Sequence, residues 1–254
     1  DQVVGGTGDM GIDGGILNFL RDLHQNLTAV VRYGKDGECT PHFSLRRGVR
    51  QGCILAPFLF LLYINHLETT LVKSSKDIAY IGRRPLASLL YADDAVLISR
   101  TALGLQRLVD AFVDFMAGLD LSTNTAKSQV MVLGPRSSKS ISYVVRGQAM
   151  SKVNQFSYLG IRFDSHNTWG PLLKSHCANT SRAVGALFSF ASRLGRSPTD
   201  TMLKIYQAKC VSVAVYGSEI WGYCNGSSLQ SIENNFCRIL LSTPPSSPAI
   251  VLHE

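Results

Sequence analysis

Apolar side chains along this chain follow two spacings, a helical one near 3.6 residues and a strand-like one of two. The helical spacing covers Gly14 to Leu27, Pro57 to about Val72, Leu103 to about Leu119, Trp169 to about Leu194 and Thr199 to about Val213. Strand-like runs cover residues 29–33, 43–45, 89–98, 130–133, 141–145 and 156–161. The pattern predicts mixed helices and strands up to about residue 165 and mainly helices beyond it.

This order of elements favours an α+β fold, because strands and helices are interspersed without the strict alternation of a parallel α/β sheet. We expect one domain over residues 1–165, in which strands and helices are mixed. A helical region should follow over residues 166–242. Proline and serine gather after residue 243, so residues 243–254 are expected to form a flexible tail.

The most unusual segment is Leu89 to Ile98, in which two apolar, strand-prone runs flank Asp93 and Asp94. The segment predicts a tight hairpin with buried arms. Two adjacent carboxylates are costly to bury, so one of three arrangements is expected: exposure at the turn, pairing with Arg or Lys, or binding of a divalent cation. Exposure is the usual arrangement for an isolated Asp-Asp pair. A magnesium site would need further oxygen ligands from elsewhere.

Composition restricts the class of protein. The 254 residues are 45% hydrophobic and 17% charged, which is enough apolar material for a core and argues against a disordered chain. The longest apolar run, Cys53 to Ile64, is too short to cross a bilayer and contains Pro57, so no membrane association is expected.

Cysteine spacing and the first residues indicate a compartment. The six cysteines form no C-x-x-C pair, and reduced thiols buried as small apolar side chains are the expected state. The first residues lack the basic and apolar regions of a secretory signal. We therefore expect an intracellular protein, in the nucleus or the cytoplasm.

The net charge of +7 is concentrated late in the chain. The stretch from Lys127 to Arg196 carries ten basic residues and one acid, Asp164. Such a stretch is either an ordinary solvated face or a track for a polyanion, which gains affinity when phosphate neutralisation releases counterions. Charge alone does not decide between them.

Several motifs, in order along the chain, resemble those of reverse transcriptases, and most closely those of non-LTR (LINE-type) retroelements. The segment Arg46 to Cys53, R-R-G-V-R-Q-G-C, resembles their Gln-Gly motif, although Ile54 and Ala56 replace its usual Pro and Ser. Tyr91-Ala92-Asp93-Asp94 is similar to their catalytic hairpin. The matching order, which runs from about residue 11 to 224, makes chance a poor explanation.

The later motifs are shorter. Residues 118–121 and 124–128 are similar to the segment that bears the family's palm lysine, here Lys127. Phe156 to Gly160 looks like the primer-grip turn, and Val215 to Gly222 resembles a motif common just beyond the thumb of these elements. The fold implied is a palm-like antiparallel sheet with packed helices, followed by a helical thumb.

The resemblance implies roles for particular residues. Asp93 and Asp94 would hold Mg²⁺, or Mn²⁺ in its place, and so activate the primer 3′-hydroxyl and neutralise the triphosphate. Template and nucleotide binding would fall to Arg50, Gln51, Gly52, Tyr91 and Ala92. Lys127 would protonate the departing pyrophosphate, although an exposed lysine without this role would look the same. The primer end would be placed by Tyr158, Leu159 and Gly160, where an ordinary β-turn is the alternative.

The implied partners are an RNA template, a DNA primer and deoxynucleoside triphosphates. One part of the family pattern is missing: the strand F-x-D-x-x-x-A-F-D, which carries another metal-binding aspartate. Asp1-Gln2-Val3 could be its trailing end, and neither Asp9 nor Asp13 is a persuasive substitute. We therefore expect part of a polymerase with little or no activity alone. The alternative is a decayed retroelement remnant that binds nucleic acid or protein without catalysis; an unrelated Mg²⁺ hydrolase ranks last.

Overall fold

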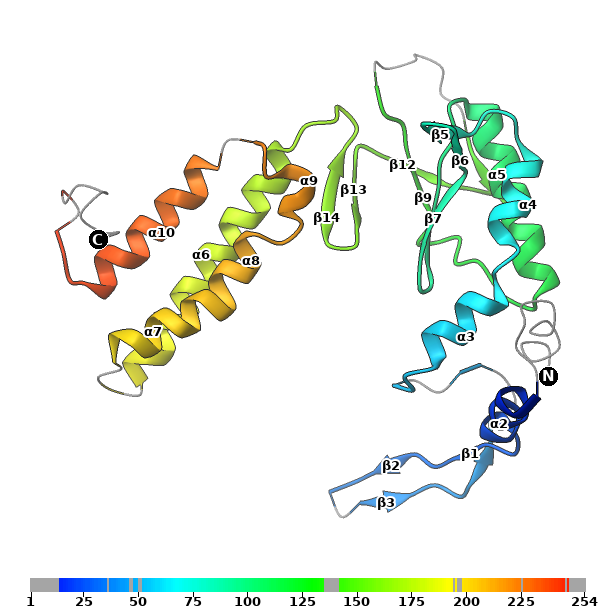
Figure 1. Cartoon of the computed structure of the whole chain (residues 1–254), viewed down its shortest axis with the longest axis horizontal. Coiled ribbons are helices and arrows are strands. Elements are labelled where there is room, and N and C mark those ends of the chain that lie inside the picture. Colours follow the sequence, from blue (N-terminus) through cyan, green and yellow to red (C-terminus); the bar gives the residue numbers. More distant parts are fainter. Residues whose placement is uncertain are drawn as a thin grey trace. The chain divides into compact units, whose positions relative to one another are not determined.

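The chain folds into helices and small two-stranded sheets, an α+β arrangement as predicted, seen in the computed structural model (Figure 1). The structure describes residues 14–35, 37–45, 48–49, 52–134, 142–193, 195, 198–224, 226–244 and 246. Two compact units are present: residues 1–126 with 141–149, and residues 127–140 with 150–254. Each unit is described by itself.

The first unit begins with a helix and two short strand pairs. Helix α2, Gly14–His24, confirms the predicted helix, which ends three residues early. The predicted strand over 29–33 is split in two, because its ends pair with different partners. These strands are β1 (Thr28–Ala29) with β4 (Phe43–Ser44), and β2 (Arg32–Tyr33) with β3 (Glu38–Cys39).

The core of the first unit lies between helices α4, Leu67–Ser74, and α5, Ala102–Gly118, which pack side by side (Figure 1). Both helices contribute fully buried leucines, Leu67, Leu71 and Leu108. Burial of such a side chain contributes roughly 1.5–3 kcal/mol. The amphipathic spacing predicted for residues 103–119 is therefore the contact face of α5.

The helix predicted over residues 57–72 is two helices, α3 (Ala56–Tyr63) and α4. Pro57 lies in the first turn of α3, where its missing N–H is not needed. The helix stops before Asn65, a residue type that competes for backbone hydrogen bonds and favours turns. The apolar pattern continues across this break, which is why it predicted one helix.

Helix α4 also anchors the strand that leads to the aspartate pair. Strand β7, Ser88–Tyr91, pairs with β8, Asp94–Leu97. The carboxylate of Glu68 accepts hydrogen bonds from the backbone N–H of Ala87, at 3.2 Å, and from the hydroxyl of Ser88. The start of β7 is thereby held on the core. A further pair, β5 (Ala79–Ile81) with β6 (Arg84–Leu86), precedes it.

A glutamine side chain joins α5 to a distant hairpin formed by β10, Val144–Val145, and β11, Gln148–Ala149. The Gln106 amide donates to the carbonyl of Val144 at 2.8 Å and accepts from the Val144 N–H at 2.9 Å. It also donates to Asp110 at 2.8 Å. Gln106 thus pairs with Val144 much as a neighbouring strand would.

We expect Gln106→Glu to release this hairpin. A carboxylate cannot donate, so it would face the Val144 carbonyl and Asp110 as a third acceptor, at a cost of about 1–3 kcal/mol. Faster hydrogen exchange at Val144 and Val145 is the measurement. Gln129→Glu is the control, since Gln129 is exposed and makes no side-chain hydrogen bond among the described residues. Equal protection in both variants would contradict the prediction.

The second unit begins with four strands and continues with helices only, as far as it is described. The strands are β9 (Gln129–Met131), β12 (Ser151–Val153), β13 (Gln155–Tyr158) and β14 (Ile161–Asp164). The helices are α6 (Gly170–Arg193), α7 (Thr199–Ile205), a π-helix (Tyr206–Val211), α8 (Ser212–Ala214), α9 (Ser218–Trp221) and α10 (Ser227–Leu240). The predicted helices over 169–194 and 199–213 are confirmed, the second with a π-helical segment.

The strand pairs correct the prediction of one antiparallel sheet. All seven pairs in the described part of the chain are separate and two-stranded, and one of them, β12 with β9, runs parallel. The segment between Met131 and Ser151 is long enough for the crossover that a parallel pair requires. Strands of two to four residues form ladders too short to merge into a broad sheet.

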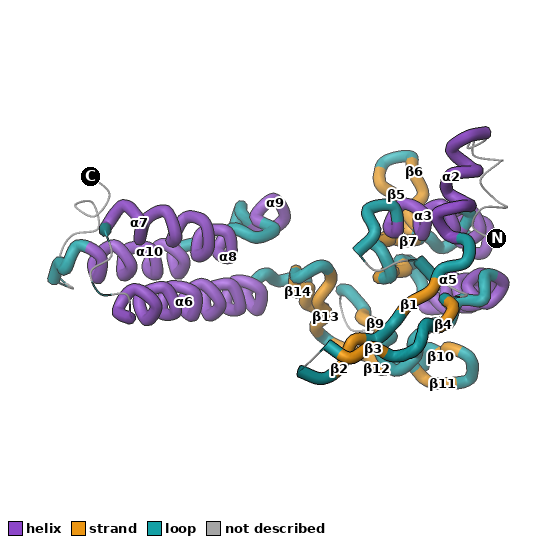
Figure 2. The backbone as a smooth tube through the Cα atoms, turned by 90° about the horizontal axis from the view of Figure 1, so that it is seen from below, coloured by secondary structure: helices purple, strands orange, loops and turns teal. Residues whose placement is uncertain are grey.

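The helical core of the second unit surrounds Phe236, which is fully buried. Helices α6, α7, α8 and α10 run alongside one another (Figure 2). The Phe236 ring stacks on Tyr206 with ring centroids 3.8 Å apart. Burial, with Glu233 nearby, raises the pKa of Tyr206 to about 12, so the phenol stays protonated in this core.

The six cysteines are free thiols in this structure. The prediction that the thiols are buried does not hold for all of them. Cys210 is buried, but Cys39 lies on the exposed strand β3. No helix in the described ranges has both the length and the apolar character needed to cross a membrane. Most of the predicted tail lies outside the described residues.

Candidate active site

The predicted hairpin with the aspartate pair is present. Tyr91 pairs with Asp94 as the last rung of β7 and β8, so Ala92 and Asp93 form a two-residue turn. Ala92 has a φ of 50°, in the left-handed region that costs a residue other than glycine roughly 1–2 kcal/mol. Strained residues of this kind gather at functional sites, and the turn is therefore a candidate for one.

The expectation that the hairpin arms are buried is met only in part, since Leu90 and Leu97 pack half-buried on the core while other positions face solvent. Leu89 is 42% exposed, Tyr91 is 62% exposed, and both aspartates are exposed. The reason is that β7 and β8 form a two-stranded sheet among the described residues, so no third strand there covers the edge or the tip. Of the three arrangements considered for the acids, exposure at the turn is the one observed.

Within the described ranges, the side chains of Asp93 and Asp94 take part in no ion pair and no hydrogen bond. Their carboxylates are thus hard oxygen ligands open to solvent, which suits Mg²⁺, an ion that binds one or two carboxylates together with waters and phosphates. They do not complete a protein cage: in the described part of the chain, no three His, Cys, Asp or Glu side chains gather as ligands. The pair fits a cation shared with a phosphorylated ligand.

Two of the other predicted groups lie in the second unit. Lys127 is exposed, in the turn that precedes β9. Tyr158 pairs with Ile161, which leaves Leu159 and Gly160 as a two-residue hairpin turn, with φ values of 49° and 76°. Positive φ at both positions is typical of the tight turns that match strand twist. Glycine tolerates this conformation, whereas Leu159 is strained in it.

The Gln-Gly motif is described only in part. Arg50 and Gln51 lie outside the described residues, as do Arg46 and Arg47 and residues 1–13. Gly52 is exposed in a turn with a φ of 82°, a conformation that glycine adopts readily. The backbone conformation alone therefore explains a glycine at position 52, independently of any contact with a template or nucleotide.

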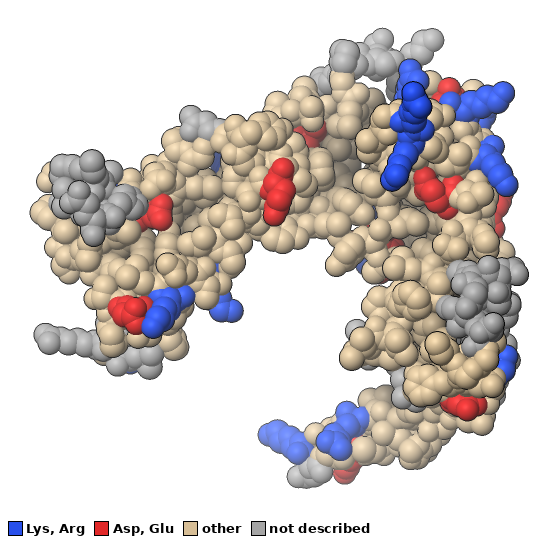
Figure 3. All heavy atoms as spheres, viewed as in Figure 1, with Lys and Arg blue, Asp and Glu red and all other residues tan. Residues whose placement is uncertain are grey.

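The basic stretch is solvent-facing. Seven of its cationic residues are described and all are exposed, namely Lys127, Arg146, Lys152, Arg162, Lys174, Arg182 and Arg193. On the face shown in Figure 3, Lys and Arg are scattered, with Asp and Glu between them, and form no continuous strip. Both interpretations of this stretch, a solvated face and a polyanion track, stay predictions.

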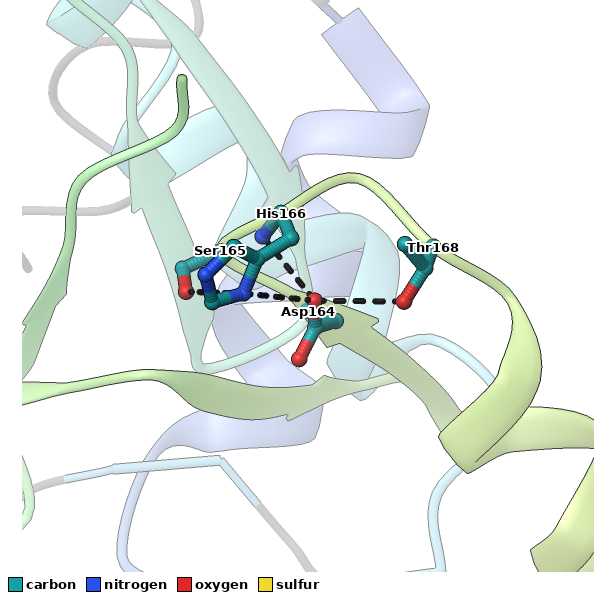
Figure 4. A network of polar contacts seen from close by, with 4 residues as sticks. All are labelled: Asp164, Ser165, His166 and Thr168. Atoms are coloured by element: carbon teal, nitrogen blue, oxygen red, sulfur yellow. Dashed lines mark hydrogen bonds and ion pairs between the residues drawn. The ribbon is translucent and has the colours of Figure 1, made fainter. Parts of the chain in front are cut away.

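Sequence reasoning missed a polar network at the end of β14 (Figure 4). The Asp164 carboxylate accepts hydrogen bonds from the backbone N–H of His166, at 2.9 Å, and from the hydroxyl of Thr168, at 3.3 Å. The His166 ring lies 3.3 Å away. The backbone bond from His166 is the main cause that lowers the pKa of Asp164 below its ordinary 3.8. The network fixes the turn that leads into α6.

We expect Asp164→Ala to lower the melting temperature of the second unit at pH 7 by loosening this turn. Because the pKa is lowered in the folded state, the stabilisation is present above about pH 4 and is lost as the pH falls through that lowered value. The difference between variant and wild type should therefore shrink as the carboxylate of Asp164 becomes protonated.

The control is Asp200→Ala, which breaks an exposed pair with Lys204 on one helix. Such pairs contribute about 0.3–0.5 kcal/mol, so little change is expected at any pH. A deficit of Asp164→Ala that persists undiminished at a pH low enough to protonate Asp164 would contradict the role given to the carboxylate.

The exposed aspartate pair can supply oxygen ligands to a divalent cation of the kind that assists phosphoryl transfer. The family model described as reverse transcriptase (RNA-dependent DNA polymerase) matches residues 19–163, more than half of the chain. The chain belongs to the reverse transcriptase family, which confirms the resemblance seen in the motifs. Members of this family generally use divalent metal ions.

Curated relatives come from non-LTR retroelements. A probable RNA-directed DNA polymerase from transposon BS of Drosophila melanogaster is 27% identical over 226 residues, 83% of this chain and 24% of the relative. The Pol polyprotein from retrotransposable element R2DM of Drosophila melanogaster is 33% identical over 137 residues, 50% of this chain and 13% of the relative. That of element R2 from Popillia japonica is 30% identical over 119 residues, 47% of this chain and 17% of the relative. The chain thus spans a quarter or less of these relatives.

Proposed function

We propose that this chain is the palm-like and thumb-like part of an RNA-directed DNA polymerase of a non-LTR retroelement. The reaction is the addition of deoxynucleoside triphosphates to a DNA primer paired with an RNA template. The observation that carries the proposal is the hairpin β7–β8: it lies inside the family match and presents Asp93 and Asp94 to solvent. The palm-like region would be residues 1–165 and the thumb-like region residues 166–242.

The aspartates supply carboxylate oxygens at the place where a nucleotide's phosphates would bind. Bound Mg²⁺, or Mn²⁺, would neutralise the triphosphate and make the primer 3′-hydroxyl a better nucleophile. Tyr91 and Ala92, which directly precede the carboxylates on the hairpin, are proposed to contact the template and the incoming nucleotide. Each part of this arrangement serves in-line attack of the hydroxyl on the α-phosphorus.

The remaining groups act on the template, the primer and the leaving group. Lys127 is proposed to protonate pyrophosphate, and its exposure in a turn is compatible with that role. Arg50, Gln51 and Gly52 are proposed to contact the template and the incoming nucleotide. The turn Tyr158–Gly160 is proposed to place the primer end.

The 254-residue chain by itself is expected to extend primers poorly. The hairpin supplies two carboxylates, those of Asp93 and Asp94. Among the described residues, no group of three His, Cys, Asp or Glu side chains lies close enough together to bind a metal ion. Two-metal phosphoryl transfer generally uses more protein oxygens than these. The same observation favours the second candidate function, a decayed retroelement-derived remnant that binds nucleic acid or protein with idle carboxylates.

The experiment compares binding and primer extension by the purified chain, using a DNA primer on an RNA template with Mg²⁺ and all four deoxynucleoside triphosphates. The polymerase proposal predicts that the nucleotide tightens binding of the duplex only when Mg²⁺ is present and Asp93 is intact. The remnant hypothesis predicts that the chain binds the duplex equally well with and without the nucleotide, and equally well after Asp93→Asn. Absence of any duplex binding would contradict the polymerase proposal and leave only a remnant that binds protein. Efficient extension would refute the expected incompleteness.

A further inference from the structure

Tyr216 lies against the hairpin turn of β13 and β14, within the second unit. Its hydroxyl donates a hydrogen bond of 2.9 Å to the carbonyl oxygen of Leu159. A Cβ atom added to Gly160 would lie 3.0 Å from Cε1 of the Tyr216 ring. The ring therefore rests on the backbone of the turn, so Gly160 is required both by its positive φ and by this close approach.

Tyr216 is itself held from the helical side. The indole N–H of Trp221 donates to the Tyr216 carbonyl at 2.9 Å, and Trp221 is buried. The next residue, Gly217, has a φ of 68°, and a Cβ there would overlap Ile161 at the start of β14. The segment Val215–Gly222, singled out by its sequence, is thus an arm that reaches from the helices to the turn.

The arm is fastened to helix α6 as well. The His176 ring lies 5.3 Å from the Trp221 ring, and its Nδ1 donates to the carbonyl of Val213 at 3.1 Å. His176 is buried on α6. A continuous set of contacts therefore runs from α6 through Trp221 and Tyr216 to the backbone of Leu159.

We infer that Tyr216 is a positioning residue for the primer end, one that acts by holding the turn Tyr158–Gly160 in place; this inference rests on the proposed function. The hairpin does not need Tyr216 to close, since the pairing of Tyr158 with Ile161 already closes it. Tyr216 is half exposed, and its hydroxyl bonds an exposed turn instead of filling the core. The turn it fixes carries a strained, partly exposed leucine at its tip.

The alternative is that the Tyr216 hydroxyl only stabilises the fold. A matched control separates the two roles, because Tyr223 also makes one hydroxyl hydrogen bond, accepting from the Trp169 indole N–H at 2.8 Å. Tyr216→Phe and Tyr223→Phe each remove one oxygen and keep the ring. Both changes lie in the same unit, but only the first touches the turn.

The test uses the 254-residue chain and two RNA–DNA duplexes, one with a recessed DNA 3′ end and one blunt. We expect the wild type to prefer the recessed end. Tyr216→Phe should reduce that preference about fivefold, the effect of losing one ordinary hydrogen bond, without weakening binding to the blunt duplex. Hydrogen exchange of residues 158–161 without nucleic acid should accelerate by a similar factor. Tyr223→Phe should leave both measurements at the wild-type value.

Three results would overturn the inference: unchanged exchange at the turn in Tyr216→Phe, faster exchange with an unchanged end preference, or the same loss in Tyr223→Phe. Failure of the proposed function is recognised separately, in the wild type. A wild-type chain that does not distinguish recessed from blunt ends would show that the turn places no primer end, and the inference would fall with it.

Discussion

Replacing both Asp93 and Asp94 by asparagine is expected to reduce the affinity of the chain for a Mn²⁺–deoxynucleoside triphosphate complex by about a hundredfold or more. Changes to residues that merely support metal ligands already cost ten- to hundredfold, and these residues are the proposed ligands themselves. The amide keeps the size of the side chain and removes its charge. Because both residues are exposed at a turn, the fold should be unaffected. Isothermal titration of the complex into each protein is the measurement.

The matched control is Asp114→Asn on α5, an exposed aspartate in the same unit without a hydrogen bond or ion pair among the described residues. It should bind the metal–nucleotide complex as tightly as the wild type. An equal loss of affinity in Asp114→Asn would mean that the hairpin acids act only through their negative charge. Unchanged affinity in the double variant would mean that Asp93 and Asp94 do not bind the metal–nucleotide complex.

The largest effect on stability is expected from Phe236→Ala in the second unit. Phe236 is fully buried, stacks on Tyr206 and contacts Phe188 with ring centroids 5.6 Å apart. Truncation of a buried phenylalanine typically costs 3–5 kcal/mol, so we expect a loss of about 4 kcal/mol in the free energy of unfolding. Urea unfolding followed by tryptophan fluorescence measures it, since Trp169 and Trp221 are the chain's two tryptophans and both lie in this unit.

Phe190→Ala is the control, because Phe190 lies on α6 and is 54% exposed. This variant should lose no more than about 0.5 kcal/mol of its free energy of unfolding, as most surface substitutions do. Similar losses in the two variants would mean that the stacked rings do not form the core of this unit.

Periodicity predicted the long helices well, because one apolar face covering a core repeats at a fixed spacing. Helix α5, Ala102–Gly118, lies within one residue of its predicted bounds. The same reasoning failed between α3 and α4, where the apolar pattern continues through a short turn that separates the two helices. The parallel pairing of β12 with β9 also left no local signal, since side-chain alternation is the same in either direction.

The hairpin of the candidate site was predictable from its two apolar runs and central acids, but its exposure was not. Burial depends on which elements cover a strand, and Leu89 is as apolar in sequence as a core residue. The positive φ angles of Ala92 and Leu159 could not be predicted from the sequence either, because neither residue type favours them. The links made by Gln106 and Tyr216 join residues 38 and 57 positions apart, which no short motif encodes.

The most direct measurement of the central claim is paramagnetic line broadening of backbone amide signals by Mn²⁺ in the presence of a deoxynucleoside triphosphate. If the carboxylates of Asp93 and Asp94 share a cation with the nucleotide's phosphates, the signals of residues 91–95 should broaden first. The effect should be lost when both aspartates are asparagine. Broadening centred elsewhere, or broadening at the hairpin that survives the double substitution, would contradict the account.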